Sequence, residues 1–520
     1  MEPRRDFDEE DGISRRNRAK GVVAKDEQGV DRIKDLPDSI LIHILSLLPA
    51  RDAVRTLIIP SFGRLWTSIY NLDFDWCLDH DCSNSSPWHC SYDEGTLLRF
   101  AEFVRRVVAL HQGPRIRKFR LHFEFSIDHQ LDELMSLELE PEELAIMIRT
   151  GGLAGEVNRW IEFAVNRKAE TLDLDFLACG YPNVGYKYEL PDFVLQSSFL
   201  TELKLVSCKV NLSTNIVMRA LKVLYLKEIA LNDDSTKNFI DGCPVLESLT
   251  VLDCYGLCEL NCVSQKLRSV TVAPGILEES RVKVACPNIE SLSISGWIER
   301  LELENLSSLR DASVDFSDCF FCVPDEYCEV RKILEELHQV RVLTMHHHPI
   351  LVLTVWELMN LPCPSNSWQR LILRTMLTKW HLPGIANVLR SSPSLEVLDI
   401  HIIPGEKTSI AAQEAWHHLY EICEGNYWDL QDRSFGCLAD CLRIVRVSGD
   451  ITKDHVIQLV RFLLRKALVL QKLVISSGPN DSSISVEESK EYSDKLSSFP
   501  RGSPQAVVVF SNEGRSFPES

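Results

Sequence analysis

The chain has 520 residues, of which 45% are hydrophobic and 25% are charged, and its formal net charge at pH 7 is −19. This balance is typical of a globular protein with a sizeable core and excludes a globally disordered chain. An acidic protein repels phosphate, so we do not expect nucleic acid as a general partner. No run reaches about 18 apolar residues, so we expect neither a membrane span nor a membrane partner.

The first 30 residues mix charges of both signs and lack a hydrophobic period, which predicts a disordered arm at 1–30 and not a secretory signal peptide. A basic cluster at 15–20 is either a nuclear import signal or, as is commoner for such runs, a solvated segment. We expect the protein in the nucleus and/or the cytoplasm, where its 17 cysteines would mostly be reduced and buried. A short disordered tail is predicted at 513–520.

Residues 31–71 predict a compact unit of three short helices. The first helix carries one apolar stripe at helical spacing, formed by Ile40, Leu41, Ile44, Leu45 and Leu48. Pro49 ends this helix and Pro60 ends the second, because proline disfavours the helical conformation of the residue before it. A unit this small would be marginally stable alone. Its excess apolar surface indicates that another protein or the following domain covers it.

A linker with a helical segment is predicted at 72–114, and an internal repeat dominates residues 115–434. Each copy has an apolar residue, two others, an apolar residue, one other and an apolar residue, as in Leu221, Leu224 and Leu226. Successive copies lie about 21 to 28 residues apart, which is the spacing of leucine-rich repeats. The last three positions predict a short strand, and parallel stacking of these strands predicts a solenoid with its core on one side.

The residues that flank the core positions form the opposite, solvent-open face of the solenoid, which is a binding platform in most such proteins. The candidate substrate-binding residues on this face are Lys204, Tyr225, Glu302, Arg374, Asp399 and His401. The copy at 298–303 follows the copy at 289–294 too soon for a full repeat. One member of this group is therefore interpreted as local noise.

Residues 31–56 resemble an F-box, and the chain is similar in particular to plant F-box proteins that carry leucine-rich repeats and a C-terminal FBD domain. Further matches lie at 103–107, 116–121, 160–165, 172–174, 190–191, 200–205, 441–445, 462–475 and 507–510. The resemblance implies an α/β fold with three parts. These are an N-terminal three-helix F-box at 31–71, an irregular leucine-rich-repeat solenoid, and an FBD-like α/β cap at 435–512.

The same resemblance implies a function without catalysis. The F-box would bind the Skp-type adaptor of a cullin–RING ubiquitin ligase, with the cullin scaffold beyond it, and the repeats would bind a substrate protein. The residues carried over to adaptor binding are Leu36, Pro37, Ile40, Leu41, Ile44, Leu45, Leu48, Pro49, Val54 and Leu57. The alternative function is a repeat-domain scaffold or inhibitor whose F-box has decayed and that has no coupling to a ligase.

The sequence departs from the F-box pattern in ways that favour this alternative. Ala50 stands where the family has a serine or threonine cap, whose loss costs about 0.5–2 kcal/mol, partly offset by Asp52 in the first turn. The stretch 59–66 is about one residue shorter than in the family. Within it, Gly63 weakens a helix by about 1 kcal/mol relative to alanine. We therefore expect the third helix to be weak.

Metal binding and catalysis have weaker support. Zinc-ligand residue types occur in four groups, namely Cys77/Cys82/His89/Cys90, Cys254/Cys258/Cys262, Cys319/Cys322/Cys328 and His346–His348. None has the spacing of paired zinc ligands. We interpret the first group as a surface loop, the cysteines near strands as buried packing residues, and the histidine triplet as an exposed loop. The sequence contains no P-loop, dinucleotide glycine motif, HExxH or GxSxG, so we expect no enzyme, no metal and no cofactor.

Overall fold

The computed structural model describes most of the chain. The described residues are 33, 36–59, 62–76, 94–123, 141–176, 187–274, 281–296, 298, 300–315, 324–404, 427–431, 434–451, 453–476, 494–496 and 498–511. Several predicted features lie outside them: the arm at 1–30 with its basic cluster, the tail at 513–520, Cys319, Cys322 and the group from Cys77 to Cys90.

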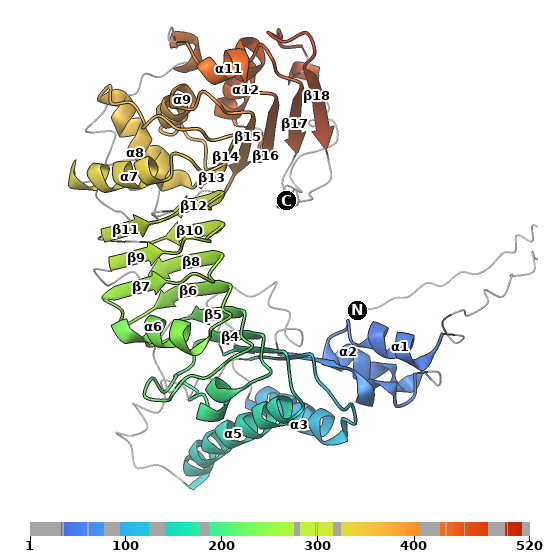
Figure 1. Cartoon of the computed structure of the whole chain (residues 1–520). Coiled ribbons are helices and arrows are strands. Elements are labelled where there is room, and N and C mark those ends of the chain that lie inside the picture. The colour runs from blue at the N-terminus through green and yellow to red at the C-terminus, as the bar shows by residue number, and fades with distance from the viewer. Residues whose placement is uncertain are drawn as a thin grey trace, which may run out of the picture.

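A single long sheet of 15 parallel strands runs through the molecule and confirms the predicted ribbon of repeats (Figure 1). Its strands in spatial order are β1 (Asn71–Asp75), β2 (Lys118–His122), β3 (Thr171–Asp175), β4 (Glu202–Val206), β5 (Val223–Lys227), β6 (Ser248–Cys254), β8 (Ser269–Pro274), β10 (Ser291–Ser295), β12 (Asp311–Asp315), β13 (Val342–Met345), β14 (Arg370–Thr375), β15 (Val397–Ile402), β16 (Ile444–Gly449), β17 (Lys472–Ser476) and β18 (Val507–Ser511). Sequence order and spatial order agree, as expected for a solenoid in which each repeat contacts its neighbours.

The register of the sheet aligns the apolar positions of successive repeats. Leu203, Leu224 and Leu249 are paired across β4, β5 and β6, and all three are at most 1% exposed. Because side chains alternate along a strand, the residue between two core positions points to the other side of the sheet. We call this side, with the alternate positions of β1 to β18, the open face.

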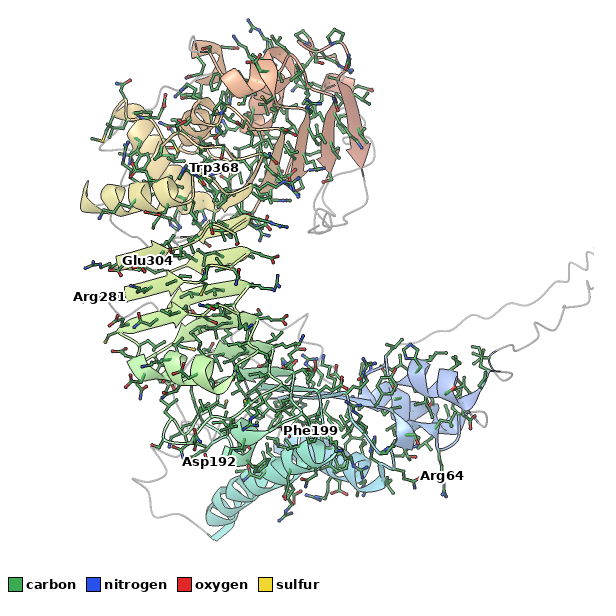
Figure 2. All side chains as sticks on the ribbon, in the orientation of Figure 1. Arg64, Asp192, Phe199, Arg281, Glu304 and Trp368 are labelled. Carbon is green, nitrogen blue, oxygen red and sulfur yellow. The ribbon has the colours of Figure 1, made fainter. Side chains whose placement is uncertain are left out.

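A second parallel sheet of three strands corrects the interpretation that one of the closely spaced copies at 289–294 and 298–303 is noise. It consists of β7 (Glu259–Val263), β9 (Arg281–Ala285) and β11 (Arg300–Glu304) in the order β11-β9-β7. Each repeat in this part of the chain therefore contributes two strands, one to the long sheet and one to the second sheet. Arg281 and Glu304 mark this sheet on the outer side of the arc in Figure 2.

Helices occupy the outer side of other repeats. They are α3 (Glu94–Leu110), α5 (Pro141–Asn166), α6 (Asp233–Gly242), α7 (Pro324–Glu336), α8 (His347–Leu358), α9 (Leu382–Ser391), α11 (Gly436–Asp440) and α12 (Asp454–Lys466), with the 3-10 helices η5 (Asp192–Gln196) and η6 (Tyr427–Leu430). The predicted exposed loop at His346–His348 is wrong, because His347 and His348 begin α8 and are only partly exposed. α8 packs closely on α9, since a Cβ at Gly384 would lie 2.1 Å from the carbonyl oxygen of Ile350.

The sheet crosses both of the predicted domain boundaries. It begins at β1, which spans the predicted boundary between the unit 31–71 and the linker 72–114, and it continues through β16, β17 and β18 of the predicted cap. The extension has a simple cause at β1 and β16, because both strands carry the same alternation of buried core residues as the central repeats. The described solenoid is therefore one continuous ribbon, with the N-terminal helices at one end of its arc and α12, β17 and β18 at the other (Figure 1).

Candidate functional site

The N-terminal helices form what we call the helical unit, residues 36–70. It contains α1 (Asp38–Leu45), α2 (Ala50–Arg55), and the 3-10 helices η2 (Thr56–Ile58) and η3 (Leu65–Ser68). α1 is amphipathic, with Leu41 and Leu45 at most 2% exposed, whereas Ile40 is 44% exposed and Ile44 39%. One side of α1 therefore faces the protein's own core, and apolar side chains also face solvent.

The third helix is as weak as expected, because the structure has only the four-residue 3-10 helix η3 in its place. Gly63 just before it has a φ of +35°, outside the helical region. α2 also lacks a side-chain cap, since the residue at its N-cap is Pro49 and Ala50 is buried. Both departures noted in the sequence thus have structural counterparts.

The helical unit is joined rigidly to the first strand of the long sheet. The side chain of Asn71 in β1 donates a hydrogen bond to the carbonyl of Ser46 at 3.0 Å. The N–H of Gln112 donates to the carbonyl of Thr67 at 2.7 Å. Ala50 and Ala53 of α2 are fully buried in the same hydrophobic cluster as the core residues of β1.

Exposed apolar residues are concentrated in and just before the helical unit. This apolar surface consists of Ile33, Ile40, Ile44, Leu47, Leu57, Ile58 and Ile59, which are between 39% and 88% exposed. Large exposed apolar areas on a soluble protein indicate an interaction site. The unit leaves this surface uncovered although it is packed against the solenoid, so the following domain covers only part of the excess apolar area.

The ten predicted adaptor-binding residues divide into three groups. Ile40, Ile44 and Leu57 belong to the apolar surface, and Pro37 is also exposed. Leu36, Leu48, Pro49 and Val54 are half-buried. Leu41 and Leu45 are at most 2% exposed, so the folded chain itself covers them and leaves neither side chain available for direct contact. Sequence reasoning missed Leu47, Ile58 and Ile59, although the run 57–59 is apolar throughout.

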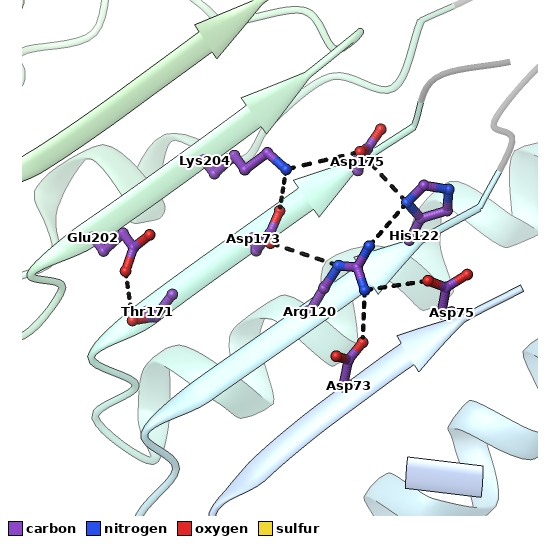
Figure 3. A network of polar contacts seen from close by, with 9 residues as sticks. All are labelled: Asp73, Asp75, Arg120, His122, Thr171, Asp173, Asp175, Glu202 and Lys204. Carbon is purple, nitrogen blue, oxygen red and sulfur yellow. Dashed lines mark hydrogen bonds and ion pairs between the residues drawn. The ribbon is translucent and has the colours of Figure 1, made fainter. Parts of the chain in front are cut away.

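A charge network occupies the open face at β1 to β4 (Figure 3). Arg120 on β2 lies 3.2 Å from Asp73 and from Asp75 on β1, and 3.6 Å from Asp173 on β3. Lys204 on β4 lies 3.5 Å from Asp173. Burial lowers the pKa of the Arg120 guanidinium, but the three aspartates raise it by more, so its net shift is upward. The network links the strand next to the helical unit to the first repeats.

His122 extends the same network. Its Nδ1 atom lies 3.4 Å from a carboxylate oxygen of Asp175. The hydrogen bond to Asp175 raises the pKa of His122 above its ordinary value, against the opposing effect of burial. The folded protein therefore favours the protonated imidazolium more than the unfolded chain does.

A second charge cluster lies at the other end of the open face, on β14, β15 and β16. Asp399 is 1% exposed, and its two carboxylate oxygens accept hydrogen bonds from Arg370 at 2.7 Å and from Arg446 at 2.9 Å. Both arginine side chains are 25% exposed. On the neighbouring positions, Arg374 is exposed, and His401 shares a hydrogen bond with the Ser448 hydroxyl at 2.7 Å.

The structure separates the six predicted substrate-binding residues. Lys204 and Tyr225 are neighbours on β4 and β5, with the ammonium 5.3 Å from the ring centre. Arg374, Asp399 and His401 share the second cluster. The prediction is wrong for Glu302, which lies on β11 of the second sheet, 2.8 Å from Arg300. It is also wrong for Asp399 as a contact residue, because two arginines cover it.

Sequence reasoning missed Arg370 and Arg446, which hold the second cluster together. Both stand at flanking positions of their repeats, but charge at such positions is common along the chain. Their special arrangement depends on the pairing of β14, β15 and β16 side by side. Pairing of this kind between strands is visible only in the folded chain.

The cysteines and histidines carry no metal site in the part of the chain that the structure describes. No group of three or more potential ligands is arranged there to hold a metal ion. The cysteines whose side chains are described form no disulfide, and most are buried, as predicted. Burial raises the pKa of the Cys208, Cys243 and Cys363 thiols to about 12, so these groups are neutral and unreactive at pH 7. Among the described helices, none is both long and apolar enough to cross a bilayer.

The long parallel sheet, the apolar surface of the helical unit and the charged open face define a leucine-rich-repeat protein with a helical unit at the start of its ribbon. Residues 129–509 match the profile of the family described as At1g61320/AtMIF1, LRR domain. Because the match covers well over half of the chain, the chain belongs to this leucine-rich-repeat family, and it is a plant-type F-box/LRR-repeat protein.

Relatives from Arabidopsis thaliana match the chain over between 43% and 87% of its length. The putative F-box/LRR-repeat protein At3g18150 is 27% identical over 463 residues, which cover 87% of this chain and 88% of the relative. The F-box/LRR-repeat protein At3g03360 is 27% identical over 77% of this chain and 76% of the relative. The F-box/FBD/LRR-repeat protein At4g00160 is 29% identical over 43% of this chain and 41% of the relative. Their names carry the F-box, repeat and FBD terms that the sequence resemblance implied.

Proposed function

We propose that the protein is a substrate-recognition subunit of a cullin–RING ubiquitin ligase and is not itself an enzyme. The helical unit binds the Skp-type adaptor, and the open face of the long sheet binds a substrate protein. Ubiquitin transfer is carried out by the other subunits. The receptor acts by holding the substrate close to them, which raises its effective concentration at the ligase.

The apolar surface of the helical unit is the observation that carries this proposal. Ile58 is 88% exposed and Leu47 68%, so both side chains are available to a partner. Removing such side chains from water contributes about 25 cal/mol per Å² of apolar area. An adaptor that covers the surface would therefore gain free energy without unfolding any part of the unit.

The rigid junction between the helical unit and β1 supports the same function. The buried alanines of α2 and the hydrogen bonds of Ser46 leave no flexible linker between the unit and the sheet. A fixed geometry places a substrate bound to the repeats at a defined position relative to the adaptor. Positioning of this kind is what a receptor without catalytic groups has to supply.

A direct binding measurement tests the adaptor role. The full-length chain is titrated with a purified Skp-type adaptor by calorimetry, and the titration is repeated with Ile44→Asp and with Ile58→Asp. A charge in the middle of an apolar contact costs several kcal/mol when buried, so we expect at least a tenfold loss of affinity. Val263→Asp is the matched control, since Val263 is 57% exposed but lies on β7, far along the chain from the unit.

The alternative function, a repeat-domain scaffold or inhibitor without ligase coupling, is favoured by the short η3 and the uncapped α2. The same titration separates the two functions. Adaptor binding that is lost in the two unit variants and kept in Val263→Asp supports the receptor. An unmutated chain that does not bind the adaptor supports the scaffold and refutes the receptor.

A further inference from the structure

The charges on the open face are distributed unevenly along the long sheet. At β1 to β4, Arg120 and Lys204 are engaged by the aspartates of the charge network. At β8 and β10, the positions on the open face carry small residues, mainly serine and threonine. The acidic residues outnumber the basic ones at β1 to β4, and β8 and β10 carry no charge at these positions, so neither region is a basic surface.

The open face at β14 to β17 differs from the rest of the sheet. Its charged residues are four basic ones and a single acidic one, namely Arg370, Arg374, Arg446, Lys472 and Asp399. Among the described residues just outside these strands, Glu396 and Asp450 are balanced in charge by Arg443 and Lys453. On a chain with a formal net charge of −19, this is a local basic area.

Asp399 holds two of these guanidinium groups in place. Its two carboxylate oxygens accept one hydrogen bond from Arg370, at 2.7 Å, and one from Arg446, at 2.9 Å. Its own side chain is 2% exposed, whereas each arginine side chain is 25% exposed. A partner at this surface therefore meets the arginines and not the carboxylate. Because the guanidinium planes are already fixed, less conformational entropy is lost when they bind a further anion.

Aliphatic side chains lie between the charges. Ile372 on β14, Val397 on β15 and Ile444 on β16 stand at the open face and are half-buried. Arginines combined with partly exposed aliphatic groups match a peptide that carries both carboxylate and aliphatic side chains. Arginine binds carboxylate through two parallel hydrogen bonds, which gives such a contact direction as well as energy.

We propose that the open face of β14 to β17 is the substrate-docking surface and that it binds an acidic segment of the substrate protein, with aspartate or glutamate side chains interspersed with aliphatic ones. This inference rests on the proposed receptor function, because it names the class of substrate that the open face holds. The carboxylates contact Arg370, Arg374 and Arg446, and the aliphatic side chains contact Ile372 and its neighbours.

The test titrates the full-length chain into a fluorescently labelled peptide of alternating glutamate and leucine. Binding is measured as the rise in fluorescence anisotropy of the peptide. A lysine–leucine peptide of equal length measures the charge preference, and a phosphoserine–leucine peptide measures the preference for phosphate. We expect binding of the glutamate peptide, at least tenfold weaker binding of the lysine peptide, and weaker binding as the salt concentration rises.

The variant Arg374→Ala/Lys472→Ala removes two exposed basic side chains without touching Asp399, and we expect at least a fivefold loss of peptide affinity. The matched control is Lys118→Ala/Lys227→Ala, which removes the same charge from open-face positions of β2 and β5. Arg446→Lys keeps the charge but not the planar fork, and we expect an intermediate loss.

Three results would overturn the inference: no binding of the glutamate peptide by the unmutated chain, equal losses in the two double variants, or binding of the phosphoserine peptide alone. The adaptor titration keeps this inference separate from the receptor function. Arg374→Ala/Lys472→Ala should bind the adaptor normally, and Ile44→Asp should bind the peptide normally. Failure of adaptor binding with intact peptide binding would refute the receptor function and leave the docking surface standing.

Discussion

Ser46, the residue that follows α1, accepts a hydrogen bond from the backbone N–H of Tyr70 at 3.1 Å, although 24 residues separate the two. Ser46 is 2% exposed, and its hydroxyl also donates to the carbonyl of Ile42 at 2.7 Å. The hydroxyl thus connects the end of α1 to the residue just before β1. This one contact helps fix the helical unit on the sheet.

Ser46→Ala should therefore destabilise the junction. The substitution leaves the N–H of Tyr70 without its acceptor in a part-buried position, and an unsatisfied buried donor costs about 1–3 kcal/mol. We expect a fall of this size in the free energy of unfolding in urea and faster hydrogen exchange at the Tyr70 amide. The control Ser39→Ala alters an exposed serine of α1 and should change stability by less than about 0.5 kcal/mol. Unchanged exchange at Tyr70 would show that another group holds the junction.

Ile44 and Leu45 are adjacent in α1 but should respond to truncation in opposite ways. Leu45 is 1% exposed, so Leu45→Ala removes core volume and should cost about 2–5 kcal/mol of stability. Ile44 is 39% exposed, so Ile44→Ala should cost far less stability while weakening adaptor binding. Urea unfolding and adaptor titration of both variants check this. Equal stability losses would mean that Ile44 is part of the core and not of the apolar surface.

The sequence predicted the strands of the long sheet well because each repeat carries its own signal. Leu224 and Leu226, for example, are spaced two apart and recur in every neighbouring strand, so the period of two and the repeat length could be measured independently. The place of β11 in a second sheet was missed because Leu301 and Leu303 have the same pattern as a strand of the long sheet. Local periodicity shows that a strand is present but not which of two sheets it joins.

The candidate site was harder to predict than the fold. The apolar stripe of α1 predicted a buried side and an apolar surface together, but it did not reveal that Leu45 faces the core while Ile44 is exposed. The pairing of Arg370 and Arg446 on Asp399 joins residues from three repeats. Such contacts depend on strand neighbours far apart in sequence, and a single sequence contains no local signal for them.

Asp399→Asn should destabilise the C-terminal part of the ribbon. The substitution removes the negative charge that Arg370 and Arg446 share, so two guanidinium groups are left facing each other without a carboxylate. Loss of a partner from a buried ion pair costs about 3–5 kcal/mol, and exposed pairs contribute at most about 1 kcal/mol. Because the arginine side chains are 25% exposed, we expect an intermediate loss of about 2 kcal/mol in the free energy of unfolding. Urea unfolding measures this loss. Asp311→Asn, at an exposed open-face position of β12, is the control and should be nearly neutral. A neutral Asp399→Asn would mean that the arginines are held by other groups.

His381, at the N-terminal end of α9, should make the protein sensitive to acid. The side chain is fully buried, and burial together with the nearby His347, His348 and Lys453 lowers its pKa from 6.5 to about 3. The unfolded chain therefore binds a proton at His381 below about pH 6.5 that the folded chain does not bind. Above this pH, His381 does not reduce the free energy of unfolding. Below it, the titration of His381 lowers the free energy of unfolding by about 1.4 kcal/mol per pH unit as the pH decreases toward 3.

His381→Asn should reduce this acid sensitivity. Asparagine does not titrate, and its side-chain oxygen can accept the hydrogen bond that Thr378 N–H donates to His381 Nδ1 at 3.2 Å. Between pH 7 and pH 5 the variant should lose about 2 kcal/mol less unfolding free energy than the unmutated chain. The comparison of the two pH profiles cancels the contributions of other histidines, including the opposite one of His122. Parallel profiles for His381→Asn and the unmutated chain would mean that folding does not lower the pKa of His381.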